Sequence, residues 1–175
     1  MFAIDLSGKT AIVTGSSQGL GLATANCLHA AGANVVINYF PDSAGKHSQH
    51  AADAVAALGE RAVAVPADVR SADDTATLVD VAVRTFGSLE ILINNAGIIR
   101  DVTVKKMSDD DWQDVIDTNL SGVFRMCKSA AETMSDGGRI VNLSSISALI
   151  GFFGQANYSA SKAGVIAFTK VLSRE

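Results

Sequence analysis

The feature that most constrains the fold of this chain is a group of three glycines between a predicted strand and a predicted helix. Residues 9–14 (KTAIVT) form a short apolar run that predicts a buried strand, and residues 19–31 are rich in helix formers. Gly15, Gly19 and Gly21 stand at the junction. In this context glycines allow a tight turn, the approach of the backbone to a pyrophosphate and close packing of the helix on the sheet. Taken alone, the pattern also fits an ordinary glycine-rich loop.

Strands and helices alternate along the rest of the chain. Apolar runs predict further strands at residues 34–39, 61–67, 89–93 and 138–143. Helices are predicted up to Leu58 after a polar segment at 41–50, from an N-cap at Ser71 to about Phe86, over 109–134 with Ser108 as N-cap, and from about Asn157. Strands that recur between helices, apolar rather than alternating, indicate right-handed βαβ units. We therefore expect one α/β domain over residues 1–175, with a Rossmann-type, doubly wound parallel sheet.

The composition fits such a domain and argues against other classes of protein. The 175 residues are 48% hydrophobic and 18% charged, which suits a sheet covered on both faces. A net charge of −4 without a basic stripe argues against general nucleic-acid binding. No apolar run is long enough for a membrane span, and the first residues do not resemble a signal peptide. We therefore expect a cytoplasmic protein.

Cysteines and histidines give little support for a metal site. Cys27 and Cys127 fall inside apolar helical patterns, so we expect both thiols to be buried in a protein of a reducing compartment. Neither belongs to a Cys-x-x-Cys motif. His47 and His50 are three residues apart, which by itself is weak evidence for shared ligation of a metal. We predict no metal.

The start of the helix after the glycines predicts a phosphate site, because its free N–H groups and positive dipole end favour an anion. Two other segments follow predicted strands, at the edge where open α/β sheets bind ligands. Asp68 is placed to accept from an adenine amino group, with a simple cap before the helix as the alternative. The small residues around Asn95 let a ribose approach, with the bracing of neighbouring loops as the alternative. The expected cofactor-binding residues here are Gly15, Ser17, Gln18, Gly19, Leu20, Gly21, Asp68, Val69, Asn95, Ala96 and Gly97.

The choice between NAD and NADP depends on the end of the second predicted strand. An acidic residue there would bind the ribose 2′-hydroxyl and repel a 2′-phosphate. This chain has Asn38 and Tyr39, with no acid before Asp42, and Gln18 in the glycine loop is uncharged. We therefore expect Asn38 and Tyr39 to border the cofactor. NADP is favoured and NAD stays possible, because no arginine clamp demands the phosphate.

A tyrosine and a lysine near the end of the chain predict acid–base chemistry. Tyr158 and Lys162 are four residues apart and so share one face of a helix. A free tyrosine titrates near pH ~10, and a nearby cation favours the phenolate. Ser144 and Ser145 follow the predicted strand at 138–143 and could polarise a carbonyl. Taken singly, a surface pair and a polar loop are the simpler readings.

Together these motifs identify a resemblance to the short-chain dehydrogenase/reductase family, and most closely to its bacterial β-ketoacyl-acyl-carrier-protein reductases. The resemblance covers essentially the whole chain. It is carried by TGSSQGLG at 14–21, ADV at 67–69, NNAG at 94–97, DTNLSGVF at 117–124, GRIVNLSS at 138–145 and GQANYSASKAG at 154–164.

The resemblance implies catalytic roles for four residues. Ser145 matches the serine that polarises the carbonyl, Tyr158 the general acid and base, and Lys162 its partner, which also binds the nicotinamide ribose. Asn119 matches an asparagine that holds a water for proton relay. The implied activity is NADPH-dependent reduction of a 3-oxoacyl thioester in fatty acid biosynthesis. The implied assembly is a homotetramer or dimer built partly on the helices at 109–134 and 157–175.

Two rival functions and one departure from the family accompany this interpretation. A sugar or polyol dehydrogenase would use the same machinery, although residues 97–112 and the GQANY segment favour the acyl-thioester type. A non-catalytic scaffold that holds a dinucleotide is a rival from another class. Relatives continue beyond Glu175, so we expect this chain to lack the last strands of the family and, by itself, to be unstable or inactive.

Overall fold

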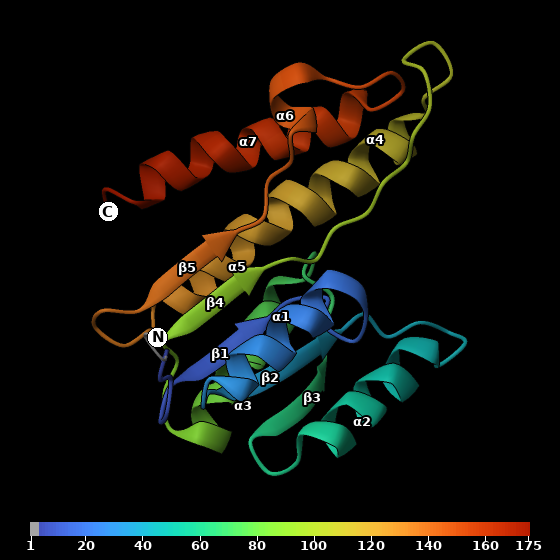
Figure 1. Ribbon diagram of the computed structural model, residues 1–175. Coiled ribbons are helices and arrows are strands. Elements are labelled where there is room, and N and C mark those ends of the chain that lie inside the picture. The colour runs from blue at the N-terminus through green and yellow to red at the C-terminus, as the bar shows by residue number, and fades with distance from the viewer. Residues whose placement is uncertain (1–3) are drawn as a thin grey trace.

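Five parallel strands form the centre of the computed structural model, which describes residues 4–175 (Figure 1). Their order in the sheet is β3-β2-β1-β4-β5. The strands are β1 (Thr10–Val13), β2 (Asn34–Tyr39), β3 (Ala62–Pro66), β4 (Ile91–Asn94) and β5 (Arg139–Asn142). The predicted Rossmann-type parallel sheet is therefore confirmed.

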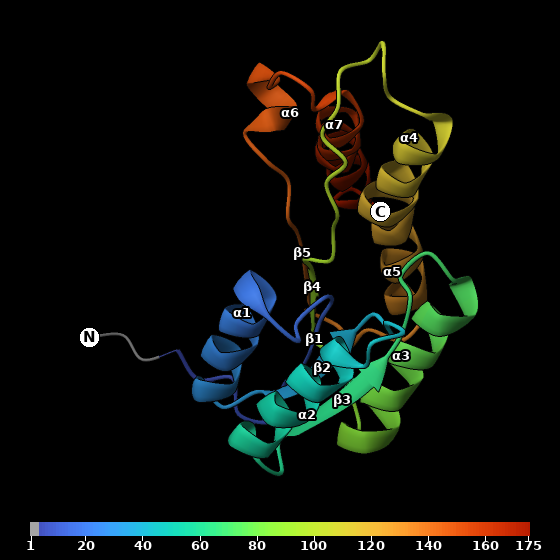
Figure 2. The ribbon, with the colours of Figure 1, turned by 90° about the vertical axis from the view of Figure 1, so that its right-hand side faces the viewer.

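Helices cover both faces of this sheet. Figure 2 shows α1 and α2 on one side and α3 and α5 on the other. The helices are α1 (Gly19–Ala30), α2 (Lys46–Leu58), α3 (Ala72–Phe86), α4 (Asp109–Ile116), the π-helix η1 (Asp117–Ser121), α5 (Gly122–Ala131), α6 (Ser147–Ile150) and α7 (Ala156–Leu172). Within residues 4–175, none of them combines the length and apolarity that crossing a membrane requires.

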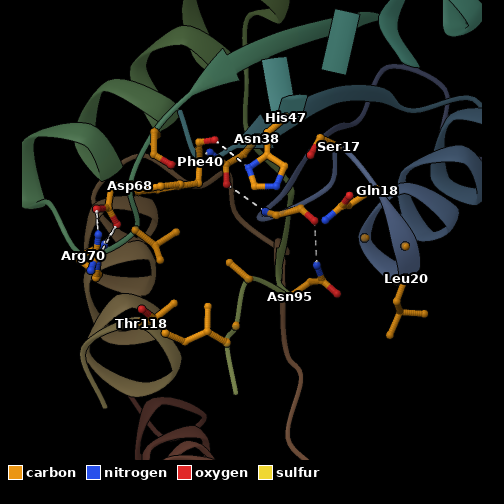
Figure 3. Close-up of a pocket in the computed structure, with 18 of the residues that line it drawn as sticks. Ser17, Gln18, Leu20, Asn38, Phe40, His47, Asp68, Arg70, Asn95 and Thr118 are labelled. Atoms are coloured by element: carbon orange, nitrogen blue, oxygen red, sulfur yellow. Dashed lines mark hydrogen bonds and ion pairs between the residues drawn. The ribbon is translucent and has the colours of Figure 1, made fainter. Parts of the chain in front are cut away.

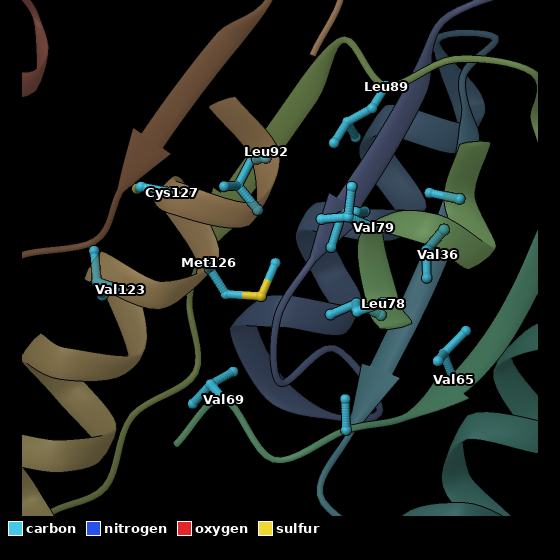
Figure 4. Close-up of a cluster of buried hydrophobic side chains, with 14 of the residues drawn as sticks. Val36, Val65, Val69, Leu78, Val79, Leu89, Leu92, Val123, Met126 and Cys127 are labelled. Carbon is cyan, nitrogen blue, oxygen red and sulfur yellow. The ribbon is translucent and has the colours of Figure 1, made fainter. Parts of the chain in front are cut away.

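Each face of the sheet has its own hydrophobic core, which explains why the strands are apolar throughout. Ile12 and Val36 turn towards α3 and α5, where they join Leu78 and Met126 (Figure 4). Val13 and its neighbours on the strands turn the other way, towards α1 and α2. Because side chains alternate between the two faces and both faces are buried, all four positions of β1 are buried and three of them are apolar.

The strand order places a crevice between β1 and β4. From β1 the chain moves outwards through β2 and β3, and α3 then returns it to the opposite side of β1. The carboxyl ends of β1 and β4 therefore lie side by side while the connections after them diverge. Open α/β sheets bind their ligands at such a switch point.

Several elements differ from the sequence predictions. The helix predicted over 109–134 is interrupted by η1, and the short helix α6 was not predicted. Capping by Ser71 and Ser108 is confirmed, since each side chain accepts the N–H of the residue three positions later. Burial is confirmed for Cys127.

The prediction that Cys27 is buried is wrong, because its thiol is exposed. The sheet-facing side of α1 carries the buried residues Gly21 and Ala25, with Leu28 packed against the same core. Cys27 lies two positions after Ala25, a rotation of about 200° around the helix, and so faces away from the sheet.

Candidate active site

The loop after β1 depends on its glycines. Gly15 and Gly19 have φ angles of +62° and +58°, a conformation that strains any other L-residue. A side chain on Gly21 would place its Cβ 2.5 Å from the Asn95 amide nitrogen and 2.5 Å from the Gly15 carbonyl oxygen. The loop is thus a turn that brings α1 directly against the ends of β1 and β4.

The first turn of α1 has the properties of an anion site. In the described structure Gln18 makes no side-chain cap bond, and the first turn contains no acidic residue. Its N–H groups and the positive end of the helix dipole are therefore available to a phosphate. The glycine loop leaves room for a phosphate to approach the backbone, so this region fits a dinucleotide pyrophosphate.

A cavity of about 550 Å³ opens beside this loop (Figure 3). The sequence predicted most of the residues that line it: Gly15, Ser17, Gln18, Gly19, Leu20, Gly21, Asn38, Asp68, Val69, Asn95, Ala96 and Gly97. It did not assign to the cofactor another group of lining residues: Phe40, His47, Ala67, Arg70, Ile98, Arg100, Asp114 and Thr118. The volume and the shared edge of the sheet suit one extended ligand.

Asn38 lies in the cavity wall, and its side chain is occupied by internal hydrogen bonds. It is fully buried, accepts the Gly15 N–H at 2.9 Å and donates to the Ala67 carbonyl oxygen at 3.1 Å. The side chain therefore ties the glycine loop to the ends of β2 and β3. The next residue, Tyr39, is absent from the cavity lining and packs against the core beneath α1 and α2, whereas Phe40 lines the cavity.

Asn95 and Thr14 close the crevice between β1 and β4. The Asn95 side chain donates to the Thr14 carbonyl oxygen at 2.8 Å, and the Thr14 hydroxyl accepts the N–H groups of Asn95 and Ala96. These bonds hold the segment 95–97 beside the glycine loop. The alternative role of Asn95, the bracing of neighbouring loops, is therefore observed, and the residue also lines the cavity.

Asp68 forms a close ion pair with Arg70, its nitrogen Nη2 lying 2.8 Å from the carboxylate. Partial burial by itself raises the pKa of Asp68, but hydrogen bonds from the Arg70 side chain and backbone outweigh that effect and lower it. Arg70 also contacts Asp114 and lies over the ring of Phe40. A charged wall therefore crosses the cavity from β3 to α4.

Lys162 is a buried ammonium group beside a tyrosine ring. Only 4% of the residue is exposed, and Nζ donates to the Leu143 carbonyl oxygen at 2.8 Å. Nζ lies 5.8 Å from the centre of the Tyr158 ring. Burial lowers the pKa of Lys162. The helix thus holds the cation at a fixed position next to the half-buried phenol.

Asn119 is brought to the same place by the π-helix. Its Oδ1 accepts the Ile98 N–H at 2.8 Å, and its Nδ2 donates to the Ile98 carbonyl oxygen at 2.9 Å. A Cβ on Gly97 would lie 3.2 Å from Asn119 Oδ1 and 3.8 Å from Lys162 Nζ. The cavity lining at Gly97 is therefore flanked by Asn119 and Lys162, two of the four side chains predicted to be catalytic.

The two serines after β5 have different surroundings. Ser144 donates to the Lys162 carbonyl oxygen at 2.9 Å and so fastens the loop to α7. Ser145 accepts the Ser147 N–H at 3.1 Å, and the Ser147 hydroxyl lies 2.6 Å from that of Ser159. Ser145 is thus connected to the residue after Tyr158 through one intervening serine.

Comparison with known proteins identifies the family. The family model described as "short chain dehydrogenase" matches residues 9–175. The chain belongs to this family. It is 45% identical to the 3-oxoacyl-[acyl-carrier-protein] reductase of Synechocystis sp., over 97% of this chain and 69% of that protein. It is 42% identical to the corresponding reductase FabG of Staphylococcus aureus, over 95% and 68%.

Solved structures of short-chain dehydrogenases agree with this assignment. A Brucella melitensis structure titled glucose/ribitol dehydrogenase superposes with a TM-score of 0.92 at 35% identity, covering 99% of this chain and 71% of that one. A dehydrogenase/reductase from Sinorhizobium meliloti gives 0.88 at 36%, covering 98% and 68%. The chain is accordingly an oxidoreductase of the short-chain dehydrogenase family, whose members use a nicotinamide cofactor.

Sequence reasoning missed one residue that positions α7 of this short-chain dehydrogenase, the helix that carries Tyr158 and Lys162. Asn157 is fully buried, donates to the carbonyl oxygens of Arg100 and Asp111, and accepts the Tyr158 N–H at 2.7 Å. It therefore fixes the start of α7 against α4 and the loop after β4. The two carbonyl groups that it contacts are more than forty residues away in the chain, so no local pattern could have revealed these contacts.

Proposed function

We propose that this chain binds NADP(H) in the cavity and reduces a ketone to a secondary alcohol. The proposed substrate is a 3-oxoacyl thioester carried on acyl carrier protein. The observation that carries the proposal is the placement of Lys162 beside the Tyr158 ring, at the end of the cavity marked by Gly97. A dinucleotide that extends from the glycine loop to Gly97 ends next to an acid–base pair.

In this proposal Tyr158 donates the proton that the developing alkoxide needs. The ammonium of Lys162 stabilises the phenolate that remains after the proton has been donated. The hydrogen bond to Leu143 keeps Nζ in place. The bound cofactor supplies the hydride.

Ser145 and Asn119 complete the proposed machinery. Ser145 donates a hydrogen bond to the substrate oxygen, where negative charge grows during reduction. Asn119 holds the backbone of Ile98 through both of its amide atoms, and it provides the anchor for a water that resupplies the proton. The lysine then connects this water to the tyrosine.

The end of β2 supports a preference for NADP over NAD. The nearest carboxylate after Asn38 and Tyr39 is that of Asp42, which accepts the N–H groups of Lys46 and His47 at the start of α2. Because the Asp42 carboxylate caps α2, it does not serve as the acidic residue that binds the ribose 2′-hydroxyl in NAD-dependent sheets. A 2′-phosphate therefore meets no carboxylate directly at the end of β2.

Two relatives support the acyl-thioester substrate, and one solved structure supports a second candidate. The two sequence relatives named above are reductases of 3-oxoacyl-[acyl-carrier-protein], at 42–45% identity. The Brucella melitensis structure is titled glucose/ribitol dehydrogenase, at 35% identity. A sugar or polyol substrate is therefore the second candidate. We also propose a homo-oligomer, built on the helices α4, α5 and α7.

An assay with two substrates and one variant tests this function. We expect the nicotinamide absorbance to fall faster with acetoacetyl thioester and NADPH than with NADH, and oxidation of ribitol to be negligible. Tyr158→Phe should lower kcat by about 10²–10⁴-fold, because it loses the proton donor. A fluorescence titration should show NADPH binding to that variant with unchanged affinity. Full turnover by Tyr158→Phe would exclude the mechanism, and turnover of ribitol alone would favour the second candidate.

A further inference from the structure

His47 lies where the end of β2 meets the cavity. It is in the first turn of α2, its side chain is about one-third exposed (31%), and it lines the cavity (Figure 3). In dinucleotide-binding sheets the carboxyl end of the second strand is the region that contacts the adenosine ribose. The imidazole is therefore at the position from which a side chain can reach the 2′ substituent that distinguishes NADP from NAD.

The hydrogen bonds of His47 fix which ring nitrogen faces outwards. Nδ1 lies 3.1 Å from the carbonyl oxygen of Phe40, and since a carbonyl oxygen only accepts, Nδ1 carries a proton. Within residues 4–175, Nε2 makes no hydrogen bond. The neutral ring therefore offers a lone pair at Nε2, and the protonated ring offers an N–H donor and a positive charge.

Carboxylates, a lysine and an arginine surround His47, which among the residues that the structure describes is the one imidazole in the cavity lining. The Asp42 carboxylate is 3.6 Å from Nδ1, and Lys46 precedes His47 on α2. On the opposite wall, Arg70 lies 5.6 Å from the centre of the Phe40 ring and is paired with both Asp68 and Asp114. The glycine loop contributes Ser17 and Gln18, which are uncharged. Among the side-chain types at this end of the cavity, imidazole is the one whose charge ordinarily changes near neutral pH.

We propose that His47 reads the ribose 2′ position and that its protonation sets the preference between NADP and NAD. The neutral imidazole accepts a hydrogen bond from a 2′-hydroxyl through Nε2, which suits NAD. The imidazolium donates a charge-assisted hydrogen bond to a 2′-phosphate, which suits NADP. The inference rests on the proposed function only in placing a nicotinamide dinucleotide in the cavity. Preference for NADPH then increases as the pH falls.

Binding measurements at two pH values test this inference without catalysis. The dissociation constants of NADPH and NADH are measured by nicotinamide fluorescence at about pH 6 and about pH 8. In the wild type we expect the ratio Kd(NADH)/Kd(NADPH) to be about tenfold higher at the lower pH. A tenfold change in this ratio corresponds to a difference of ~1.4 kcal/mol in binding free energy. In His47→Gln this ratio should change less between the two pH values than it does in the wild type. In His47→Lys the ratio should be high at both pH values.

A matched control separates His47 from the phosphate itself, which also titrates near pH ~6. His50→Gln makes the same change one turn further along α2, outside the cavity lining, and should behave as the wild type. If the ratio of dissociation constants changed equally with pH in His47→Gln and His50→Gln, the role of His47 would be overturned, but the binding of the dinucleotide in the cavity would not. Failure of the wild type to bind either dinucleotide would overturn the proposed function as well, so the two failures are distinguishable.

Discussion

The two halves of the sheet hold their functional groups in different ways. β1 is buried at every position and β2 along its centre, and the cavity beside them is shaped by backbone and glycines. β5 lies at the edge of the sheet, with alternately exposed and half-buried residues (Figure 1). Beside this edge, side chains proposed for catalysis bond to distant backbone: Lys162 to the carbonyl oxygen of Leu143, and Asn119 to the N–H and carbonyl groups of Ile98.

This difference shows which physical feature each half needs. A phosphate site requires free backbone N–H groups and an absence of side chains, which a short glycine pattern provides locally. An acid–base pair requires a charged group to be buried close to its partner, which only the assembled fold provides. The first half is therefore sensitive to added atoms, and the second to lost hydrogen bonds and charges.

The largest expected effect comes from removing the buried cation. Lys162→Met keeps the length and packing of the side chain but removes the ammonium beside Tyr158. We expect kcat to fall by about 10²–10⁴-fold, the usual contribution of acid–base catalysis. Lys170→Met makes the same change at an exposed position on α7 and should have little effect on kcat. Comparable rates for the two variants would contradict the proposed role of Lys162.

The same substitution has a defined effect on stability. Since burial lowers the pKa of Lys162, the folded chain releases this proton at a lower pH than the unfolded chain, whose lysine has the ordinary value of 10.5. Between those two pKa values the unfolded state binds more protons, so the free energy of unfolding rises with pH. In urea unfolding, the free energy of unfolding of the wild type should therefore increase relative to that of Lys162→Met as the pH rises towards 10.5, the pKa of the lysine in the unfolded chain.

A pair of glycine substitutions tests the contrast between a rigid and an adaptable half. In Gly21→Ala the new Cβ meets the Gly15 carbonyl oxygen at 2.5 Å, which is backbone and cannot move aside. In Gly164→Ala it meets the terminal methyl groups of Leu120, from 2.7 Å, which can rotate away. We expect the first to lower the free energy of unfolding by about 1–3 kcal/mol and the second by clearly less, because the Leu120 side chain can rotate whereas the Gly15 backbone cannot.

Urea unfolding of both variants checks this, together with a titration of NADPH. Gly21→Ala should also weaken NADPH binding, since its Cβ would displace the Asn95 amide that joins β4 to the glycine loop. Equal losses of stability in the two variants would mean that the loop after β1 is as adaptable as the packing around α7.

The sequence predicted the cofactor half more completely than the catalytic half. β2 begins and ends where predicted, and the capping serines of α3 and α4 were identified, because these features depend on neighbouring residues. The interruption by η1 could not be predicted in this way. Asn119 bonds to Ile98, twenty-one residues earlier, and helical periodicity contains no information about such a contact.

Within the site, charge pairing was the feature that sequence reasoning described least well. Asp68 was recognised for its position after β3, but its pairing with Arg70 was not foreseen, although the two are only two residues apart. The interaction requires the backbone turn after β3 to direct both side chains to the same wall. Tyr39 was predicted beside the cofactor, and the side chain instead packs in the core while Phe40 lines the cavity.

The smallest expected effects concern the two cysteines, one in each half. Cys27 is exposed on α1, whereas Cys127 is buried on α5, with Sγ 3.3 Å from the Asn94 amide nitrogen. Burial raises the pKa of the Cys127 thiol to about 11. Because the thiolate is the reactive form, iodoacetamide at about pH 8 should alkylate Cys27 and spare Cys127. Mass spectrometry of tryptic peptides measures this directly, and Cys27→Ser should remove the fast reaction.

The raised pKa of Cys127 also predicts how stability changes at alkaline pH. The folded chain keeps this proton up to about pH 11, while the unfolded chain loses it from the ordinary value of 9.0. The folded state therefore binds more protons in this interval, and the stabilisation that is present below about pH 9 is lost as the pH rises towards 11. Relative to Cys127→Ala, the wild type should lose at most about 2–3 kcal/mol of unfolding free energy over this range. Early alkylation of Cys127 in the folded chain would instead show that α5 opens readily from β4, and that the catalytic half is looser than its buried contacts indicate.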